Sequence, residues 1–252
     1  MQIEGATALV TGGNRGIGEA FVRALLEAGA AKVFVGARNL AEAAHLADEA
    51  PGRAIPIKLD VTVPDHIAAA KAMGGDVSIL INNAGAFHHT TLMTAPDLSA
   101  ARDEMEVNYF GPLALARALA PILARNGGGA IVNVLSSGGM VAVPAMGGYS
   151  PSKFAGRAAT TCIRAELASQ GTQVTALIVG SVDTRMAAHV AGYKEPPSDI
   201  AKAGLNAIRR GIDELDTDRM AIEVRASLAR DPKALERSMA KMLTAATITT
   251  GR

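Results

Sequence analysis

The feature that most constrains the fold of this chain is an alternation of short, β-branched apolar runs with alanine-rich stretches of helical period, over its first 180 residues. The runs are continuously hydrophobic, which is typical of strands buried on both faces between layers of helices. Six runs are present, at residues 6–11, 32–36, 54–60, 77–82, 130–136 and 173–180. Strand, helix and strand repeated in this way predict an α/β fold, a doubly wound parallel sheet with helices on both faces.

The pattern weakens after residue 180, but no linker-like change of composition divides the chain, so residues 1–252 are predicted to form a single domain. Residues 185–200 are rich in small residues and contain two prolines, which indicates a mobile loop that we interpret as the substrate loop. Two helices are predicted at 199–211 and 226–242, and a short last strand is predicted at 219–224. Residues 243–252 are predicted to be a tail without regular structure.

Composition and charge exclude several classes of protein. Lys and Arg number 25 against 24 Asp and Glu, so no nucleic-acid or membrane partner is expected. The single cysteine, Cys162, excludes an intramolecular disulfide and a multi-cysteine metal site. The first residues do not resemble a secretory signal, and no apolar run approaches the roughly 18 residues needed to span a bilayer. We therefore expect a soluble, cytoplasmic protein.

A glycine-rich turn, TGGNRGIG, follows the first predicted strand at residues 11–18. Gly12, Gly16 and Gly18 allow the backbone to turn sharply and to approach a pyrophosphate closely. The helix predicted to follow presents free N–H groups and the positive end of its dipole to that anion. A tight turn alone would account for a glycine triplet, but the strand, turn and helix context favours a dinucleotide site of the Rossmann type.

The end of the second predicted strand indicates which dinucleotide is bound. In NAD-binding folds an acidic residue near this place takes the ribose hydroxyls. In this chain the corresponding place is occupied by Gly36, Ala37 and Arg38. It therefore offers an arginine and no carboxylate. Arg38 and Arg15 together suit the 2′-phosphate of NADP(H). Solvated surface arginines are the alternative interpretation, and an NAD-linked alcohol dehydrogenase of a hydroxylated metabolite is the rival function.

Three polar side chains are predicted to converge at the ligand edge of the sheet. Tyr149 and Lys153 form a Y-x-x-x-K pair at the start of a predicted helix, where four-residue spacing places both on one face. Ser136 ends the fifth predicted strand thirteen residues earlier, and the carboxyl ends of parallel strands face the ligand crevice. A hydroxyl, a phenol and an ammonium group can together polarise a carbonyl and move a proton during hydride transfer.

With these motifs in order, the chain resembles the short-chain dehydrogenase/reductase family over roughly residues 5–185. The resemblance also rests on Asp60 at a strand end, on NNAG at 82–85, on Asn108 within VNYFG and on a PGxVxT-like segment. It implies a reversible transfer of hydride between nicotinamide and a carbonyl or alcohol substrate. The catalytic residues that it implies are Asn108, Ser136, Tyr149 and Lys153.

The resemblance implies a role for each of these residues. Tyr149 would act as acid or base, with its pKa lowered by roughly three units, or about 4 kcal/mol, from the reference value near 10. Lys153 and the oxidised nicotinamide would together favour the phenolate, and Lys153 would also hold the nicotinamide ribose. Ser136 would bind the substrate oxygen, and Asn108 would anchor a water. The cofactor-binding residues implied are Thr11, Gly12, Asn14, Arg15, Gly16, Ile17, Gly18, Arg38, Asp60, Val61, Asn83, Ala84, Gly85, Tyr149, Lys153, Gly180, Val182 and Thr184.

The chain departs from the family pattern in two places. Val179 stands where the family usually has proline, which changes the entry into the following loop. The glycine-rich last strand of many members is absent from the sequence, which puts their usual tetramer contacts in doubt. A homodimer or homotetramer is still expected, with pairing through the long helices near 99–125 and 150–169.

The residues that flank the predicted site indicate the type of substrate. They are largely apolar, which favours a small to medium hydrophobic ketone, aldehyde or secondary alcohol. They are Met140, Val141, Val143, Met146, Met186 and Tyr193. Whether His88 or His89 lines the pocket is left open, and neither has further ligands at metal-binding spacing, so no metal is expected. A non-catalytic, NADP(H)-binding redox sensor is the alternative of another class.

Overall fold

Seven parallel strands form one sheet, in the order β3-β2-β1-β4-β5-β6-β7. The computed structural model describes the backbone of residues 1–250 and the side chains of residues 1–243. The strands are β1 (Thr7–Thr11), β2 (Lys32–Ala37), β3 (Ala54–Lys58), β4 (Val77–Asn82), β5 (Gly129–Val134), β6 (Thr172–Ile178) and β7 (Glu214–Asp216). The predicted doubly wound parallel sheet of an α/β fold is confirmed.

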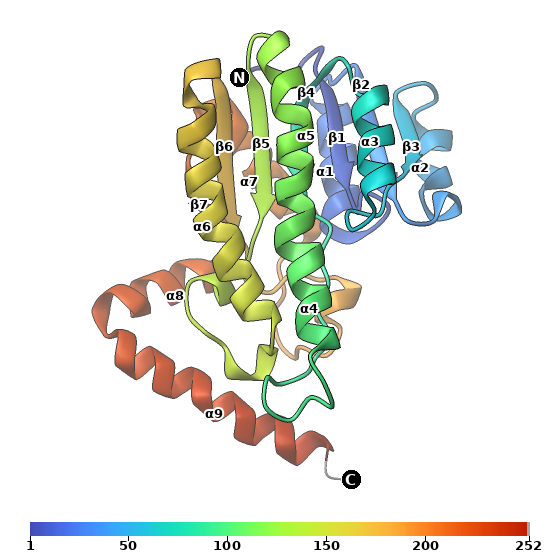
Figure 1. Ribbon diagram of the computed structural model, residues 1–252. Helices are drawn as coiled ribbons and strands as arrows, with labels where there is room; N and C mark the ends of the chain where they lie inside the picture. The colour runs from blue at the N-terminus through green and yellow to red at the C-terminus, as the bar shows by residue number, and fades with distance from the viewer. Residues whose placement is uncertain (251–252) are drawn as a thin grey trace.

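Helices cover both faces of the sheet (Figure 1). Helices α1, α2 and α7 pack on one face, and α3, α5 and α6 pack on the other. The helices are α1 (Gly16–Glu27), α2 (Ala44–Glu49), α3 (Pro64–Met73), α4 (Ser99–Met105), a π-helical turn (Glu106–Phe110), α5 (Gly111–Arg125), α6 (Tyr149–Leu167), α7 (Pro197–Arg210), α8 (Arg219–Arg230) and α9 (Pro232–Thr250).

The core explains why the strand sequences are continuously apolar. In β1, Ala8 and Val10 join the core under α1 and α7, whereas Leu9 joins the core under α5 and α6. Each strand therefore buries both of its faces, as parallel strands between helix layers must. Gly204 lets α7 approach α1 closely, because a Cβ there would lie only 2.5 Å from the ring of Phe21.

The chain reverses its direction of winding between β1 and β4, which are neighbours in the sheet. A crevice forms at such a reversal, outside the carboxyl ends of the strands. The segments that follow β1, β4, β5 and β6 all begin at this edge, so the four predicted motifs are brought to one place.

The carboxyl-terminal part differs from the prediction. The segment RMAIEV, predicted as the last strand, lies in α8, and the last strand is Glu214–Asp216 instead. Asp218 caps α8 by accepting a hydrogen bond from the backbone N–H of Ala221. Ala221, Val224 and Leu228 recur at helical spacing and pack on the sheet, which outweighs the β-branched character of the run.

The helix predicted at 226–242 is two helices, α8 and α9, separated at Asp231 and Pro232. Proline fits the first turn of a helix but would break the interior of one. The predicted tail at 243–252 is wrong as far as Thr250, because α9 continues to that residue, and the last two residues lie outside the described part. Figure 1 shows α9 crossing the edge at which the strands end, where it contacts Pro144–Met146.

One helix overturns the expected location of the protein. Ser99–Arg125 is a continuous helix of 27 residues with a mean hydropathy of 1.3 over an 18-residue window, of which 39% is buried. By length and composition it is able to cross a membrane. The prediction from sequence counted only uninterrupted apolar runs as membrane-spanning. Polar residues such as Arg117 interrupt the apolar run in this helix, but the helix is apolar on average. The prediction of a soluble, cytoplasmic protein rested on that premise and is wrong, and no location is assigned.

Candidate active site

The glycine turn between β1 and α1 has the steric properties of a dinucleotide cradle. Gly12 and Gly16 have φ angles of +59° and +56°, which favour glycine. A Cβ on Gly18 would lie 2.1 Å from the carbonyl oxygen of Gly12, so no larger residue fits there. No side chain caps the N-terminus of α1, which leaves its first N–H groups free for an anion. These residues fit a pyrophosphate.

Thr11 and Asn83 join the ends of β1 and β4 beside this cradle. The hydroxyl of Thr11 accepts hydrogen bonds from the backbone N–H groups of Asn83 and Ala84, at 3.0 and 2.9 Å. The amide of Asn83 donates to the carbonyl oxygens of Thr11 and Gly12, at 3.0 and 3.2 Å. Four residues predicted to bind the cofactor thus hold one another in place at the strand reversal.

At the end of β2, the structure adds a carboxylate that sequence reasoning did not find. Glu42 accepts hydrogen bonds from Asn14 at 2.7 Å and from Arg15 at 3.3 Å, and both charged side chains are about half exposed. The prediction considered only the end of β2 itself, at residues 36–38, and did not include this carboxylate beside Arg15. The short helical turn at Leu40–Ala43 causes the difference, because it brings Glu42 back toward the glycine turn.

Asp60, at the end of β3, accepts hydrogen bonds from the backbone N–H and the hydroxyl of Thr62, at 3.0 and 2.7 Å. Burial raises the pKa of Asp60, but these bonds and the charge of Arg38 outweigh it, so the pKa is lowered overall. The side chain of Val61 is buried in the core beside Gly111, and that of Ile17 packs against the core under α1.

The predicted catalytic residues Ser136, Tyr149 and Lys153 meet at the ends of β5 and α6. Ser136 lies near enough to Tyr149, which is 8% exposed, to oppose the rise in the pKa of its phenol. The Lys153 ammonium lies 5.5 Å from the centre of the Tyr149 ring and donates to the carbonyl oxygen of Val134 at 3.0 Å. A phenol, a hydroxyl and an ammonium group therefore share one largely buried space.

Burial shifts the pKa values of the two titratable groups toward their neutral forms. Burial raises the pKa of Tyr149 from 10.0 to about 12, the Ser136 hydrogen bond opposes this, and the charge of Glu104 adds to it. Burial lowers the pKa of Lys153 from 10.5 to about 8. The lowering of the Tyr149 pKa implied by the family resemblance includes the effect of a bound, oxidised nicotinamide. Among the chain's own groups burial dominates and raises this pKa.

Asn108, in the π-helical turn, joins the segment after β4 to α6. Its amide nitrogen donates to the carbonyl of Ala86 and to the hydroxyl of Ser152, both at 2.9 Å. Its amide oxygen accepts from the N–H of Ala86, also at 2.9 Å. Both amide N–H groups are thus used within the chain, and the implied role as a water anchor stays a prediction.

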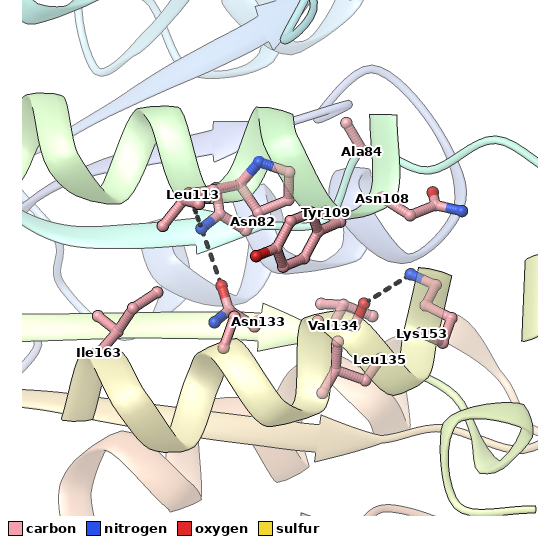
Figure 2. A pocket seen from close by; sticks show the side chains of 13 residues that line it. Asn82, Ala84, Asn108, Tyr109, Leu113, Asn133, Val134, Leu135, Lys153 and Ile163 are labelled. Carbon is pink, nitrogen blue, oxygen red and sulfur yellow. Dashed lines mark hydrogen bonds between the residues drawn. The ribbon is translucent and has the colours of Figure 1, made fainter. Parts of the chain in front are cut away.

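A small cavity lies behind Lys153, between β4, β5, α5 and α6 (Figure 2). Its volume of about 20 Å³ is enough for about one water molecule. Figure 2 shows Lys153 directed to Val134 at one end and Asn82 paired with Asn133 at 2.8 Å at the other. Among the described residues, Oδ1 of Asn82 is buried without a hydrogen-bond partner, which gives such a water a polar contact.

The segment after β6 closes the opposite side of the crevice. Gly180 donates its N–H to Asp218 at 2.6 Å, and a Cβ on Gly180 would lie 2.3 Å from the same carboxylate. Val182 is buried, and the methyl group of Thr184 lies 3.2 Å from the place of a Cβ on Gly16. Thr184 therefore borders the cradle, and its role in holding the carboxamide stays a prediction.

Aromatic rings cover Tyr149 on the side expected to receive substrate. The ring of Phe87 lies 4.9 Å from that of Tyr149 and 3.9 Å from that of His89, and His89 meets His189 edge-on at 4.4 Å. His88 instead pairs with Asp103 at 2.6 Å and is exposed. His89 is thus the histidine that joins this aromatic group.

The predicted apolar lining is only partly present at this place. Met140, Val141 and Val143 are buried, whereas Tyr193 is 76% exposed and bonds to Glu195. In the described part of the chain, no group of three or more His, Cys, Asp or Glu side chains is placed to hold a metal ion.

Sequence reasoning did not single out four residues that the fold brings to this edge, namely Glu42, Phe87, Glu104 and His189, although His189 lies in the predicted substrate loop at 185–200. Glu104 lies four residues before Asn108, so it shares a helix face with a predicted catalytic residue, and this spacing was a usable signal. The other three come from turns and loops, where neither period nor motif marks them.

Comparison with known proteins decides the family. The family described as short chain dehydrogenase matches residues 6–194, which is most of the chain. The chain belongs to the short-chain dehydrogenase family. Members of this family are oxidoreductases. The family resemblance predicted from the motifs is thereby confirmed.

Individual relatives show how far the likeness extends. The chain is 34% identical over 196 residues to dehydrogenase/reductase SDR family member 7B of Mus musculus, covering 73% of this chain. It spans about 60% of the length of the curated relatives that it matches. A short-chain dehydrogenase of Burkholderia cenocepacia, solved in complex with NADP, has a TM-score of 0.89 and 40% identity over 95% of this chain and 99% of its own.

A further solved structure binds the other dinucleotide. The 3-ketoacyl-(acyl-carrier-protein) reductase of Brucella melitensis, complexed with NADH, has a TM-score of 0.80 and 26% identity, over 86% of this chain and 99% of its own. Solved relatives thus bind NADP or NADH, and the likeness in fold does not by itself choose between them.

Proposed function

We propose that this short-chain dehydrogenase is an NADPH-dependent carbonyl reductase, reversible as an alcohol dehydrogenase. Its substrates are small to medium hydrophobic ketones, aldehydes or secondary alcohols. The observation that carries the proposal is the convergence of Ser136, Tyr149 and Lys153 beside a glycine cradle in which Gly18 admits no side chain. A nicotinamide dinucleotide, when bound, supplies the hydride chemistry.

Each residue of the chain then has a defined task. Ser136 donates a hydrogen bond to the substrate oxygen, and Tyr149 gives that oxygen its proton in reduction and removes it in oxidation. Lys153 holds the nicotinamide ribose, and Asn108 keeps the segment after β4 against α6. Thr184, on the opposite wall, holds the carboxamide.

The adenosine end supports NADP(H). Arg15 and Arg38 both lie there, Arg38 close enough to Asp60 to lower the pKa of that carboxyl group. Guanidinium groups bind a 2′-phosphate through charge-assisted hydrogen bonds. The NADP-bound relative with 40% identity supports the same choice.

Glu42 favours the second candidate, an NAD-linked alcohol dehydrogenase. A carboxylate beside the glycine turn can accept hydrogen bonds from ribose hydroxyls, which is how NAD-binding folds hold the ribose. Glu42 is already engaged by Asn14 and Arg15, however. The presence of two arginines and the NADP-bound relative support NADPH as the first choice.

The aromatic cover of Tyr149 by Phe87 and His89 supports a hydrophobic substrate. The loop at 185–200 contributes His189 to the same cover and is proposed as the substrate loop. We also propose that residues 1–252 act as one domain and pair into a homodimer or homotetramer through the helices at 99–125 and 150–169.

The test is cofactor oxidation by the purified protein with NADPH and NADH in parallel, across aliphatic, aromatic and cyclic ketones and aldehydes. We expect turnover with NADPH on apolar carbonyls and much weaker turnover with NADH. Arg38→Asp is expected to erode the preference for NADPH at unchanged fold. Equal use of both cofactors by the wild type and the variant would refute the assigned 2′-phosphate site.

A further inference from the structure

Two histidines from distant parts of the sequence meet where the loop at 185–200 reaches the candidate site. The rings of His89 and His189 lie edge to face, with centroids 4.4 Å apart and an interplanar angle of 85°. Phe87 extends the contact inward, since its ring lies 3.9 Å from that of His89 and 4.9 Å from that of Tyr149. Four aromatic rings from three segments of the chain thus form a continuous series that ends at the proposed acid and base.

The segment at 87–90, which carries two of these rings, is held firmly by its neighbours. The backbone N–H of His88 donates a hydrogen bond to Glu104 on α4 at 2.8 Å. The carbonyl oxygen of Thr90 packs against Gly147, where a Cβ would lie only 2.3 Å from it. This segment is therefore a fixed part of the site against which the loop can close.

The backbone of this segment is strained at His89. Among the described residues other than glycine, His89 alone has a positive φ angle, of +54°. Such a conformation persists only where the surroundings hold it, and it is concentrated at ligand sites and at switch segments. Here it accompanies the contacts of the imidazole with Phe87 and His189. The strain indicates that this placement of the imidazole serves the site.

The loop itself is closed at its base and carries His189 near its middle. Asp183 and Glu195 donate their backbone N–H groups to the carbonyl oxygens of Glu195 and Ser181, both at 2.9 Å. Lys194 also pairs with Asp183 at 3.2 Å. Because these bonds fix only the base, the contact at His189 controls whether the middle of the loop lies over the site.

The charge of the two imidazoles decides whether this contact is favourable. Neutral rings attract one another edge to face, whereas two imidazolium groups at this distance repel. His89 faces His189 from the loop and His88 from its own segment, and Tyr149 approaches from α6. The charge of His88 is in turn paired with Asp103 of α4 at 2.6 Å.

The charged residues of the loop do not neutralise the two imidazoles. In the part of the chain that the structure describes, neither His89 nor His189 pairs with a carboxylate. Burial lowers the pKa of His89, and the charges of His189 and His88 lower it further, in agreement with the geometry. The other charged residues between the base of the loop and the start of α7 are Asp183, Arg185, Lys194, Glu195 and Asp199.

We propose that His89 and His189 form a latch, which holds the loop at 185–200 closed over Phe87 and Tyr149 while both imidazoles are neutral and releases it when they become charged. Both are positioning residues, since they act on the substrate through the loop. The inference rests on the proposed function, in which this loop covers the substrate. The closed loop is favoured above the ordinary histidine pKa of 6.5 and is lost progressively as the pH falls below it.

The test compares His189→Phe, which keeps a ring and removes the charge, with His189→Ala, which removes the ring. Hydrogen exchange of residues 183–195, followed by mass spectrometry at about pH 8 and about pH 5.5, reports opening of the loop without any turnover. Each variant is compared with the wild type at the same pH, so that the intrinsic exchange rate is shared. His45→Phe, which replaces an exposed histidine on α2, is the matched control.

At about pH 8 we expect the loop to exchange at the same rate in the wild type and in His189→Phe, and about 2- to 10-fold faster in His189→Ala, the worth of an edge-to-face ring pair. At about pH 5.5 the wild type is expected to exchange faster than His189→Phe by a similar factor, and His45→Phe to match the wild type. The KM for an apolar ketone is expected to rise in acid for the wild type and not for His189→Phe, with kcat changing less.

A second variant tests the other half of the latch. His89→Asn removes the ring but tolerates the left-handed backbone, so it is expected to resemble His189→Ala at both values of pH. Slow exchange of the loop in His89→Asn at about pH 8 would overturn the assignment of His89.

Three further results separate the possible failures. Equal exchange in the wild type and His189→Ala at about pH 8 would overturn the latch, and equal exchange in the wild type and His189→Phe at about pH 5.5 would overturn its release by charge. Absence of carbonyl turnover by the wild type would instead overturn the proposed function. The exchange measurement still decides the latch in that case.

Discussion

Residues up to Ile178 and residues beyond it line the same edge of the sheet, but different forces hold them there. In the first region, position is dictated by close approach of backbone atoms, as at Gly18 against the carbonyl of Gly12. In the second region, position is dictated by polar side chains, as at Asp218, which binds the N–H groups of Gly180 and Ala221.

A cluster of charged side chains also holds the carboxyl-terminal region in place by polar contacts. Glu214 on β7 accepts two hydrogen bonds from Arg157 on α6, both at 2.8 Å, and one from Arg225 on α8 at 2.7 Å. Arg225 also binds Asp216. A position with close backbone contacts accepts almost no residue other than glycine, whereas a stabilising hydrogen bond can be made by several kinds of polar side chain. The first region therefore carries recognisable motifs, and the carboxyl-terminal region is free to diverge.

The largest effect is expected in the first region, from Gly18→Ala. The added Cβ would lie 2.1 Å from a backbone oxygen that cannot move without displacing β1. Overpacking of this kind costs about 3 kcal/mol, and we expect dinucleotide binding to fall at least tenfold in calorimetric titration. Gly75→Ala is the control, since nothing lies within 4 Å of that position. Normal binding by Gly18→Ala would refute the steric account of the cradle.

In the second region, Glu214→Ala is expected to lower the free energy of unfolding by about 2 kcal/mol, because Arg157 loses its carboxylate partner and Arg225 keeps only Asp216. Hydrogen bonding from Arg157 is the main cause of a lowered Glu214 pKa. The stabilisation is therefore present above the ordinary pKa of 4.5 and is lost as the pH falls through the lower folded value.

Urea unfolding at pH 7 and at acidic pH measures this effect. The difference between the wild type and Glu214→Ala is expected to shrink at the lower pH. Glu223→Ala, which removes an exposed pair with Arg219, is the control and should change stability little. A difference that is the same at both values of pH would contradict the assigned ion pair.

Removal of the cap on α8 is expected to have a smaller effect. Asp218→Ala loses the hydrogen bonds to Gly180 and Ala221 and should cost about 1–2 kcal/mol in thermal or urea unfolding. Asp218→Asn keeps an acceptor and should cost less. Asp231→Ala, which uncaps the more exposed helix α9 at Ala234, gives the comparison. If Asp218→Ala and Asp231→Ala lower the free energy of unfolding equally, the hydrogen bond between Asp218 and Gly180 contributes no stability.

The smallest effect is expected at the exposed adenosine end. Glu42→Gln releases Arg15 from an exposed pair, which is worth at most about 1 kcal/mol, so NADPH should bind up to about fivefold more tightly. Glu49→Gln, which removes the charge that pairs with Arg23, should leave NADPH binding unchanged. Weaker binding of NADPH by Glu42→Gln would indicate that Glu42 contacts the cofactor.

The two regions also differ in how well their sequences predict their structure. Strands such as Val77–Asn82 and the motif residues Thr11, Asn83, Tyr149 and Lys153 lie where they were predicted, because period and steric limits are local properties. The segment RMAIEV was misassigned because its helical form depends on a cap at Asp218 and on packing against the sheet.

The parts of the site that could not be predicted come from contacts between distant segments. Glu42 reaches the glycine turn through a short helical turn, and His189 reaches His89 across a hundred residues of sequence. The raised pKa of Tyr149 in the chain alone follows from burial, which no motif encodes. The spacing of motifs in the sequence predicted the candidate catalytic residues, whereas the residues around them could be identified only from the fold.

The most direct test of the central claim is the rate of NADPH oxidation by Tyr149→Phe with an apolar ketone, measured beside the Kd for NADPH. The account predicts a loss of turnover of about 10²- to 10⁴-fold, the usual contribution of a general acid, with NADPH binding changed by only a few fold. Turnover that is undiminished in Tyr149→Phe would contradict the account, because Tyr149 is the group assigned to give the substrate oxygen its proton.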